Sequence, residues 1–264
     1  MYPYDIVLGF DLYDLSIVIG FFAALVFFRF WADRRSFSAA LQNLCIVGAL
    51  VAMLGGFGLA VVTQAFYNFM ASGVFEIAAT TGATFYGGLI GGAGSFLLIY
   101  FVGGFLVLKD REHVKCFFSL SEIAAGSIAL AHGFGRIGCL FAGCCYGRVT
   151  DAWYGVYNIY LGKSTVPVQL FEAAFLFALA FYMCYRLGKQ QKGNLGIYLI
   201  AYAAWRFFAE YLRDDARGAT VVSFLTPSQL IALLLILLGV GLWWLESFLA
   251  KRTQRKEAKD DDQA

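Results

Sequence analysis

Seven apolar runs of about 20 residues constrain the fold of this chain more than any other feature. A helix must be about 20 residues long to cross the roughly 30 Å of hydrocarbon in a bilayer, so each run predicts one spanning helix. Only 14% of the 264 residues are charged, whereas about 25% is usual in a soluble domain. We therefore predict an all-α membrane protein with seven transmembrane helices, at residues 12–31, 44–66, 86–108, 120–140, 167–187, 195–212 and 227–249.

The basic residues indicate how these helices are oriented. With seven spans, 14 of the 20 lysines and arginines follow the first, third, fifth or seventh run and so lie on one side of the membrane. By the positive-inside rule this side is the cytoplasm. We predict that residues 1–250 form the transmembrane domain, with the N-terminus outside. The polar residues 251–264 lack apolar periodicity and are predicted to be a disordered, charged cytoplasmic tail.

The segment 132–148, HGFGRIGCLFAGCCYGR, is the strongest candidate for a functional site. Its Arg136 ends an apolar run, and an arginine at lipid depth costs several kcal/mol unless it faces a polar cavity or a partner. Arg206 interrupts the sixth run in the same way. Because a guanidinium matches two phosphate oxygens, the two arginines predict a phosphate or carboxylate site. The alternative is that each arginine extends to the membrane interface.

Polar residues near the sixth and third runs extend this hypothesis. Arg206 and Glu210 are four residues apart and can pair on one helix face. Arg213 follows on nearly the same face, so one carboxylate could orient both arginines; a charge-neutralised helix end at the interface is the alternative. Tyr86 lies beside two glycines at the start of the third run. It could present its hydroxyl to a ligand or belong to the tyrosines of the membrane interface.

The cysteines and histidines leave several interpretations open. Cys139, Cys144 and Cys145 contain no C-x-x-C pair, so their spacing is poor for zinc and we expect no metal. A disulfide, a reactive thiolate and small packing residues remain possible, and packing is favoured. His132 shares a helix face with Arg136 and either lines the same cavity or is a buried, hydrogen-bonded side chain, which we favour. His113 lies in a basic loop and is expected to be solvated.

Six motifs in order resemble the bacterial prolipoprotein diacylglyceryl transferase family, over about residues 13–244. The similarity covers Tyr13 with Gly20, the F-x-G-G-L-I-G segment 85–91, the G-R-x-G segment 135–138 followed by Gly143, Gly147 and Arg148, the segment 166–172, the R-F-x-x-E-x-x-R segment 206–213, and Gln229-Leu230. The sequence departs from the family pattern at four polar positions. Tyr86 and Val166 replace histidines, Cys139 replaces an asparagine and Cys144 replaces an acidic residue.

The resemblance implies a multi-pass enzyme of the bacterial cytoplasmic (inner) membrane. Such enzymes move the diacylglyceryl group of phosphatidylglycerol to the lipobox cysteine of lipoprotein precursors, whose signal peptides they bind among membrane lipids, without a cofactor or nucleic acid. The implied catalytic residues are Tyr86, Arg206 and Glu210, and the implied substrate-binding residues are Tyr13, Arg136, Gly138, Cys139, Gly147 and Arg213. Since a phenol of pKa about 10 is a poor base, we expect Tyr86 only to donate a hydrogen bond. The alternative is a paralogue that binds or transfers a phospholipid without modifying lipoproteins.

Overall fold

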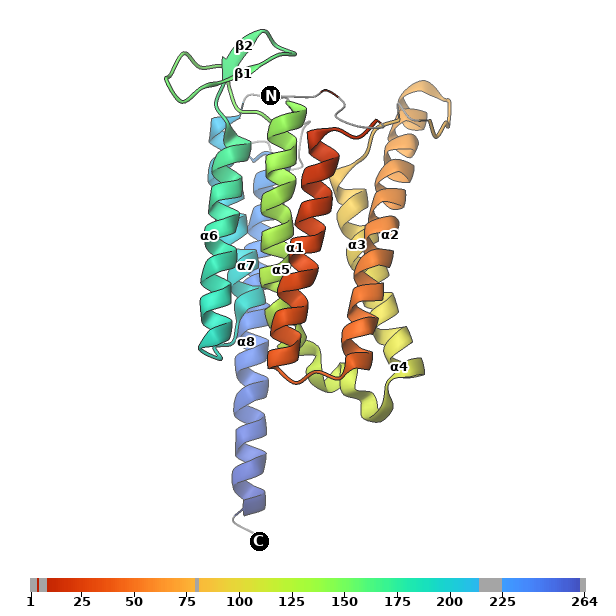
Figure 1. Cartoon of the computed structure of the whole chain (residues 1–264), viewed down its shortest axis with the longest axis vertical. Coiled ribbons are helices and arrows are strands. Elements are labelled where there is room, and N and C mark those ends of the chain that lie inside the picture. Colours follow the sequence, from red (N-terminus) through yellow and green to blue (C-terminus); the bar gives the residue numbers. More distant parts are fainter. Residues whose placement is uncertain (1–3, 5–8, 79–80, 214–224, 262–264) are drawn as a thin grey trace. The chain divides into compact units, whose positions relative to one another are not determined.

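The computed structural model of the chain describes residues 4, 9–78, 81–213 and 225–261. The helices are α1 (Leu12–Arg34), α2 (Ala39–Ser72), α3 (Phe85–Leu98), α4 (Gly104–Val107), α5 (Glu112–Ala142), α6 (Val168–Gly188), α7 (Asn194–Ala209) and α8 (Pro227–Asp261) (Figure 1). A short π segment, η1 (Ile99–Gly103), joins α3 to α4, and the 3-10 turns η2 (Lys109–Arg111) and η3 (Glu210–Leu212) precede α5 and follow α7. Strands β1 (Val156–Asn158) and β2 (Lys163–Thr165) form one antiparallel hairpin.

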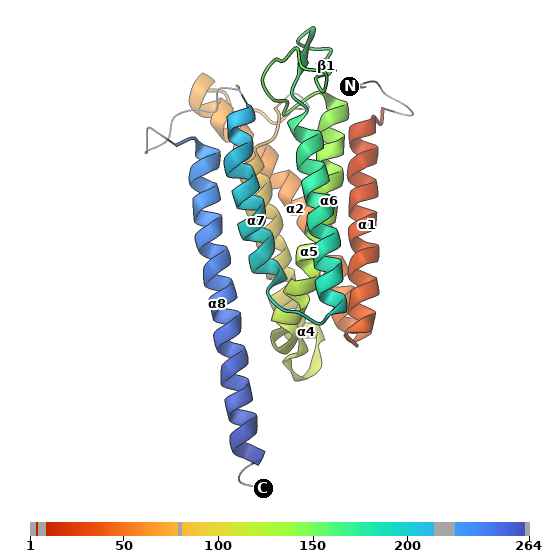
Figure 2. The same cartoon turned by 90° about the vertical axis from the view of Figure 1, so that its left-hand side faces the viewer.

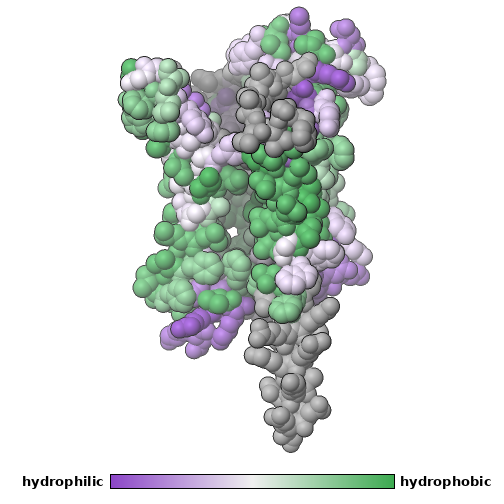
Figure 3. Space-filling model, turned by 180° about the vertical axis from the view of Figure 1, so that it is seen from behind, coloured by the Kyte–Doolittle hydropathy of each residue, from purple (hydrophilic) through white to green (hydrophobic). Residues whose placement is uncertain are grey.

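Six helical segments of the described residues are long and apolar enough to cross a membrane, so the chain is an all-α, multi-pass membrane protein, as predicted. They are Leu12–Arg34, Ala39–Ser72, Tyr86–Val107, Lys109–Ala142, Val168–Gly188 and Pro227–Glu246. On the face shown in Figure 3, the coloured surface is mostly apolar along the middle of the helices, and the most hydrophilic residues lie toward their ends. The remaining predicted run corresponds to α7, which has 16 residues. At about 1.5 Å per residue that helix is about 24 Å long, so a seventh span stays a prediction.

The helix ends differ from the predicted runs because capping residues and helix propensity, and not hydropathy alone, set them. Ser38 caps α2 by accepting a hydrogen bond from the Leu41 backbone N–H (3.1 Å), so α2 begins at Ala39, five residues before the predicted start at residue 44. At the other end of the chain, α8 continues to Asp261, through most of the segment predicted to be disordered. Lys, Arg, Glu and Ala there are good helix formers, and extending an existing helix costs little.

The chain divides into two compact units. Unit 1 comprises Met1–Trp31 and Phe118–Ala264, and unit 2 comprises Ala32–Phe117. The prediction that residues 1–250 act as one domain therefore stays a prediction.

In unit 1, α5 contacts both α1 and α6, and α7 lies next to α6 (Figure 2). Gly126 of α5 faces the Phe27 ring of α1, and Gly133 faces the Phe177 ring of α6. An apolar core joins α5, α6 and α7, formed by Ala125, Ala129, Leu176, Leu179, Ala180, Met183, Tyr198 and Tyr202. The start of α1, the end of α5, the end of α7 and the hairpin all lie at the same end of this unit (Figure 1). The segments with candidate site residues in unit 1 therefore lie at one end.

Unit 2 is held together by glycines on facing helices. A Cβ on Gly91 of α3 would lie 2.5 Å from the Gly55 carbonyl oxygen of α2, and one on Gly56 would lie 3.1 Å from the Gly88 oxygen. This close approach is the packing expected of small residues in membrane helices. The prediction for His113 was wrong: it is fully buried, because α5 begins at Glu112 and turns His113 onto the Tyr100 and Phe105 rings.

Candidate functional site

A polar cluster lies inside the apolar core of unit 1 and centres on Glu172 of α6. Its Oε1 lies 3.1 Å from Arg136 Nε of α5 and accepts a hydrogen bond from the Tyr202 hydroxyl of α7 at 3.0 Å. Arg136 Nη2 donates in turn to the Tyr202 hydroxyl at 3.5 Å. The Arg136 and Glu172 side chains are only 15% and 2% exposed. Three helices thus contribute one charged or hydroxyl group each to a single buried contact.

Helical spacing explains why these groups meet. His132 and Arg136 are one turn apart on α5, and Tyr198, Tyr202 and Arg206 follow at four-residue intervals on α7, so each set shares a helix face. His132 Nδ1 lies 3.2 Å from the Tyr198 hydroxyl, one turn from the contact between Arg136 and Tyr202. The hydrogen bond in the favoured interpretation of His132 is confirmed, but its side chain is 21% exposed and not fully buried.

Arg206 continues the polar cluster by one more turn of α7. Its Nη2 lies 3.0 Å from Glu210 Oε2, and the two side chains are 14% and 8% exposed. The predicted pair at four-residue spacing is therefore confirmed. The same Nη2 donates to the Ser228 hydroxyl of α8 at 3.0 Å. Arg136 contacts Tyr202, which lies one turn before Arg206 on α7, and the side chains of the two arginines are at most 15% exposed, so neither extends into bulk solvent.

Arg213 takes a different place from the one predicted. The α-helical geometry of α7 stops at Ala209, η3 follows, and Arg213 itself is extended (φ −114°, ψ 150°). Arg213 therefore does not continue the helix face of Arg206 and Glu210. Its Nη1 donates to the Cys145 carbonyl oxygen at 2.8 Å, which ties the end of η3 to the turn after α5.

Gly147 and Arg148 hold that turn against two other segments. The Gly147 N–H donates to the Val166 carbonyl (2.9 Å), and the Arg148 N–H donates to the Leu212 carbonyl (2.9 Å). A Cβ on Gly147 would lie 2.7 Å from the Leu212 oxygen and 2.8 Å from the Val166 oxygen. Only glycine fits between these backbones, so packing alone requires a glycine here, and the implied substrate-binding role of Gly147 stays a prediction.

Tyr13 and Gly138 meet where the start of α1 crosses the end of α5. A Cβ on Gly138 would lie 3.1 Å from the Tyr13 ring and 3.2 Å from its carbonyl oxygen. The Tyr13 side chain is about one-third exposed. Cys139 is the next residue of α5 and lies in the same region.

The implied site residues are therefore divided between the two units. Tyr13, Arg136, Gly138, Cys139, Gly147, Arg206, Glu210 and Arg213 all lie in unit 1, at its hairpin end. Tyr86 lies in unit 2, in the first turn of α3, and is exposed.

Three cysteines gather beside this region. The sulfur atoms of Cys139, Cys144 and Cys145 all lie within 4.8 Å of one another, and all three are free thiols. Hydrogen bonds with the Cys139 and Cys144 thiols, together with the positive charges of Arg136 and Arg213, lower the pKa of the Cys145 thiol below its ordinary value. The positive charges of Arg136 and Arg213 therefore act on the Cys145 thiol as well.

Sequence reasoning missed three residues of the polar cluster, namely Glu172, Tyr202 and Ser228. Glu172 carried a signal, because it is the only charged side chain between Val168 and Tyr185 and an intramembrane carboxylate implies a partner. Tyr202 and Ser228 gave no such signal, since tyrosine and serine are common in membrane helices. Only the packing of α5, α6, α7 and α8 identifies them.

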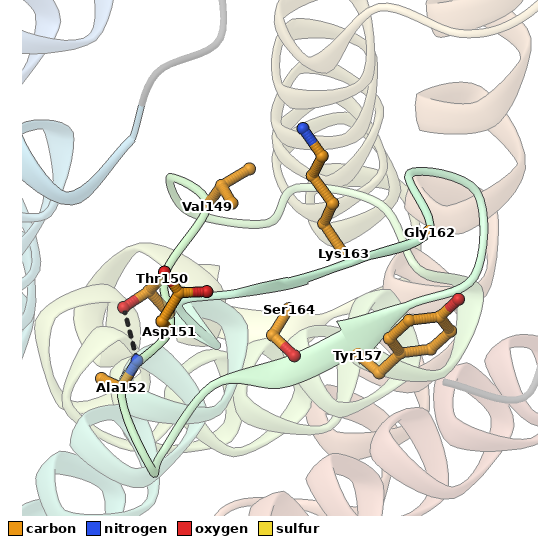
Figure 4. A pocket seen from close by; sticks show the side chains of 8 residues that line it. All are labelled: Val149, Thr150, Asp151, Ala152, Tyr157, Gly162, Lys163 and Ser164. Atoms are coloured by element: carbon orange, nitrogen blue, oxygen red, sulfur yellow. Dashed lines mark hydrogen bonds between the residues drawn. The ribbon is translucent and has the colours of Figure 1, made fainter.

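The hairpin carries a separate pocket of about 640 Å³ (Figure 4). It is lined by Val149, Thr150, Asp151, Ala152, Tyr157, Gly162, Lys163 and Ser164. The Lys163 amino group points away from the Tyr157 ring (Figure 4), and the lining contains a single cation. The polar cluster offers two adjacent guanidinium groups, so we place the candidate site there and not in the hairpin pocket.

Comparison with known proteins gives consistent matches over most of the chain. Residues 4–245 match the family model for prolipoprotein diacylglyceryl transferase. A phosphatidylglycerol–prolipoprotein diacylglyceryl transferase of Clostridium tetani is 32% identical over 244 residues, which cover 89% of this chain and 93% of that protein. A second protein of this name, from Clostridium perfringens, is 31% identical over 90% of this chain and 92% of its own length. Another protein of this name, from Chromohalobacter salexigens, is 32% identical over 87% of this chain and 85% of its own length.

Proposed function

Because the chain belongs to the prolipoprotein diacylglyceryl transferase family, we propose that it transfers the diacylglyceryl group of phosphatidylglycerol to the lipobox cysteine of lipoprotein precursors. A carbon–sulfur bond forms to the cysteine thiol, and the carbon–oxygen bond to the phosphate breaks. Glycerol 1-phosphate leaves, and the thiol proton passes to water or to the phosphate. The proposed reaction needs no cofactor.

The observation that carries this proposal is the pair of buried guanidinium groups, one from Arg136 of α5, which contacts Tyr202 of α7, and one from Arg206, one turn further along α7. Charge builds on the phosphate as it leaves, and cations already fixed in a dry site stabilise that charge without reorganising. Arg136 is fixed by Glu172 and Tyr202, and Arg206 is fixed by Glu210 and Ser228. We assign both arginines to the lipid phosphate and Glu210 to the positioning of Arg206.

The remaining residues take roles that the family resemblance supports. Tyr13, Gly138 and Cys139 would line the lipid-binding side at the junction of α1 and α5, and Gly147 and Arg213 would hold the turn beside it. Tyr86 occupies the position of the family histidine, and we assign it a hydrogen bond to the reacting groups and not the role of base. Precursor signal peptides are the proposed protein partner.

We further propose that α7 completes a seventh span, with the N-terminus outside and the C-terminus in the cytoplasm. The distribution of basic residues supports this orientation. Arg136 and Arg206 then lie in the outer half of a bacterial cytoplasmic (inner) membrane, where secreted precursors arrive. Fusing a reporter that is active only in the cytoplasm to each end tests the orientation.

A co-expressed lipoprotein precursor tests the reaction. In a strain depleted of its own transferase, mass spectrometry should detect the added diacylglyceryl mass on the precursor, and a precursor with serine at the lipobox cysteine should gain none. Arg206→Ala should abolish the added mass, while Lys163→Ala, which removes an exposed cation at the same end of unit 1, should keep it. No added mass with the wild-type chain would disprove the proposed reaction.

One alternative function has a specific observation in its favour. Cys139 and Cys144 stand where the family has an asparagine and an acidic residue, and both lie in the cysteine group beside the polar cluster. A paralogue that binds or transfers phospholipid without modifying lipoproteins would keep the arginines and tolerate these changes. It would bind phosphatidylglycerol in an Arg206-dependent manner and leave the precursor mass unchanged.

A further inference from the structure

The turn after α5 brings three cysteines together by a defined backbone geometry. Gly143 is left-handed (φ 71°), its N–H donates to the Leu140 carbonyl (3.3 Å), and the Cys144 N–H donates to the Cys139 carbonyl (3.2 Å). These two bonds form the Schellman ending of a helix, which folds the chain back over its last turn. Cys144 is thereby returned to Cys139, although five positions separate them.

Cys145 completes the group through an unusual backbone conformation. Its φ is +59°, a left-handed value that side chains with a Cβ rarely adopt and that persists only where the surroundings enforce it. Three side chains hold the turn in this conformation by donating hydrogen bonds to three successive carbonyl oxygens. Asn158 Nδ2 donates to that of Gly143 (3.1 Å), Gln169 Nε2 to that of Cys144 (2.6 Å), and Arg213 Nη1 to that of Cys145 (2.8 Å). Asn158 and Gln169 are themselves almost fully buried.

From this arrangement we propose that Cys139, Cys144 and Cys145 form a three-sulfur site for a soft, thiophilic cation such as Zn(II) or Cu(I). The expectation of no metal was based on sequence spacing, which does not account for the reversal of the chain at Gly143. Three sulfurs around a zinc ion at about 2.3 Å lie about 3.8–4.0 Å from one another. The sulfurs here lie within 4.8 Å, so side-chain rotation alone could close the site.

The surroundings of the sulfurs suit a cation better than simple packing. Cysteines that only fill space are buried among apolar groups, as Cys45 is, whereas Cys144 is exposed and its sulfur lies within 4.8 Å of those of Cys139 and Cys145. The exposed Cys144 provides an entry path for the ion. A complex of three thiolates with a mono- or divalent cation keeps a net negative charge, which the charges of Arg136 and Arg213 near Cys145 offset. Each thiol that binds releases its proton to solvent.

Direct metal binding to the reduced, full-length protein in detergent tests this site without any lipid reaction. Elemental analysis after zinc or Cu(I) loading should find about one ion per chain, and Cd(II) should give a thiolate-to-metal charge-transfer band. Replacing the three cysteines with serine should abolish both signals. The matched control is the Cys116→Ser/Cys184→Ser double variant, which removes two other half-buried thiols and should bind as the wild type does.

Two milder variants protect the test against misfolding. Cys144→Ser changes only an exposed side chain and should weaken Cd(II) binding at least about tenfold. Gln169→Ala keeps all three thiols but frees the Cys144 carbonyl, and should weaken binding about 10–100-fold if its melting temperature shows that the protein is folded. If the reduced wild type binds none of the three metals stoichiometrically, or if the triple variant binds as well as the wild type, the proposal is wrong.

Discussion

Glu172→Gln removes the carboxylate at the centre of the polar cluster while keeping its shape. The amide oxygen can still accept the hydrogen bond from the Tyr202 hydroxyl, but Arg136 loses the negative charge that lies 3.1 Å from its Nε. Removing one member of a buried ion pair costs about 3–5 kcal/mol, because the other charge is left uncompensated. Arg136 keeps 15% exposure, so we expect a loss near the lower limit, about 3 kcal/mol.

This loss should appear as a lower melting temperature in zwitterionic detergent. At roughly 2–4 °C per kcal/mol for a chain of this size, the decrease should be roughly 6–12 °C. Phosphatidylglycerol should restore more stability to Glu172→Gln than to the wild type, because its phosphate then meets an Arg136 whose charge no carboxylate at position 172 neutralises. A lipid at about 100 times its Kd adds about 2.7 kcal/mol, which is comparable to the loss. Phosphatidylcholine in place of phosphatidylglycerol controls for the charge of the headgroup.

Glu122→Gln is the matched control for this experiment. Glu122 is also a buried carboxylate of unit 1, but it accepts from the backbone N–H groups of Gly193 and Asn194, both at 2.7 Å, at the opposite end of α7. Replacing the Glu122 carboxylate should lower the melting temperature, but it should not change how much phosphatidylglycerol stabilises the protein. The reasoning is refuted if Glu172→Gln melts like the wild type, or if both variants gain equally from the lipid.

Four further substitutions have defined outcomes. Ser228→Ala removes one acceptor from Arg206 but leaves Glu210 in place, so initial lipidation rates should fall about fivefold, equivalent to about 1 kcal/mol; an unchanged rate would show that Ser228 does not orient Arg206. Tyr86→Phe should slow lipidation about tenfold if the hydroxyl donates one hydrogen bond, and full activity would remove Tyr86 from the mechanism. Gly147→Ala should lower the free energy of unfolding by about 1–3 kcal/mol because its Cβ would meet two carbonyl oxygens, whereas Gly58→Ala, with no atom within 4 Å of its added Cβ, should be neutral or stabilising in thermal melts.

The positions of the helices were predictable because bilayer thickness sets the length of an apolar run. Features that depend on individual polar contacts could not be predicted from the sequence. The start of α2 depends on Ser38, and the burial of His113 depends on where α5 begins. Likewise, no hydropathy pattern indicates that α7 changes to a 3-10 turn at Glu210, which moves Arg213 off the expected face.

The candidate site shows the same division between local and distant contacts. The Arg206–Glu210 pair follows from four-residue spacing and could be predicted. The Arg136–Glu172 pair joins residues of different helices, and sequence spacing does not indicate which face of α6 packs on α5. The three cysteines are an intermediate case, because Gly143 after a long helix is a typical stop signal, but the left-handed conformation of Cys145 depends on Asn158, Gln169 and Arg213.

The two carboxylates of the polar cluster neutralise the buried arginines when no lipid phosphate is bound. Two guanidinium groups fixed in an apolar interior would destabilise the protein whenever no lipid phosphate is bound. Glu172 and Glu210 neutralise Arg136 and Arg206 in that state, at 3.1 Å and 3.0 Å, and hold them where a phosphate can reach them. The closest contact of each carboxylate is with one nitrogen of its arginine, and a guanidinium has five N–H donors, so a phosphate can bind beside the carboxylate without displacing it. Because the carboxylates neutralise part of the arginines' positive charge, they weaken the binding of the lipid headgroup. They also keep the site folded and the arginines oriented between successive substrates.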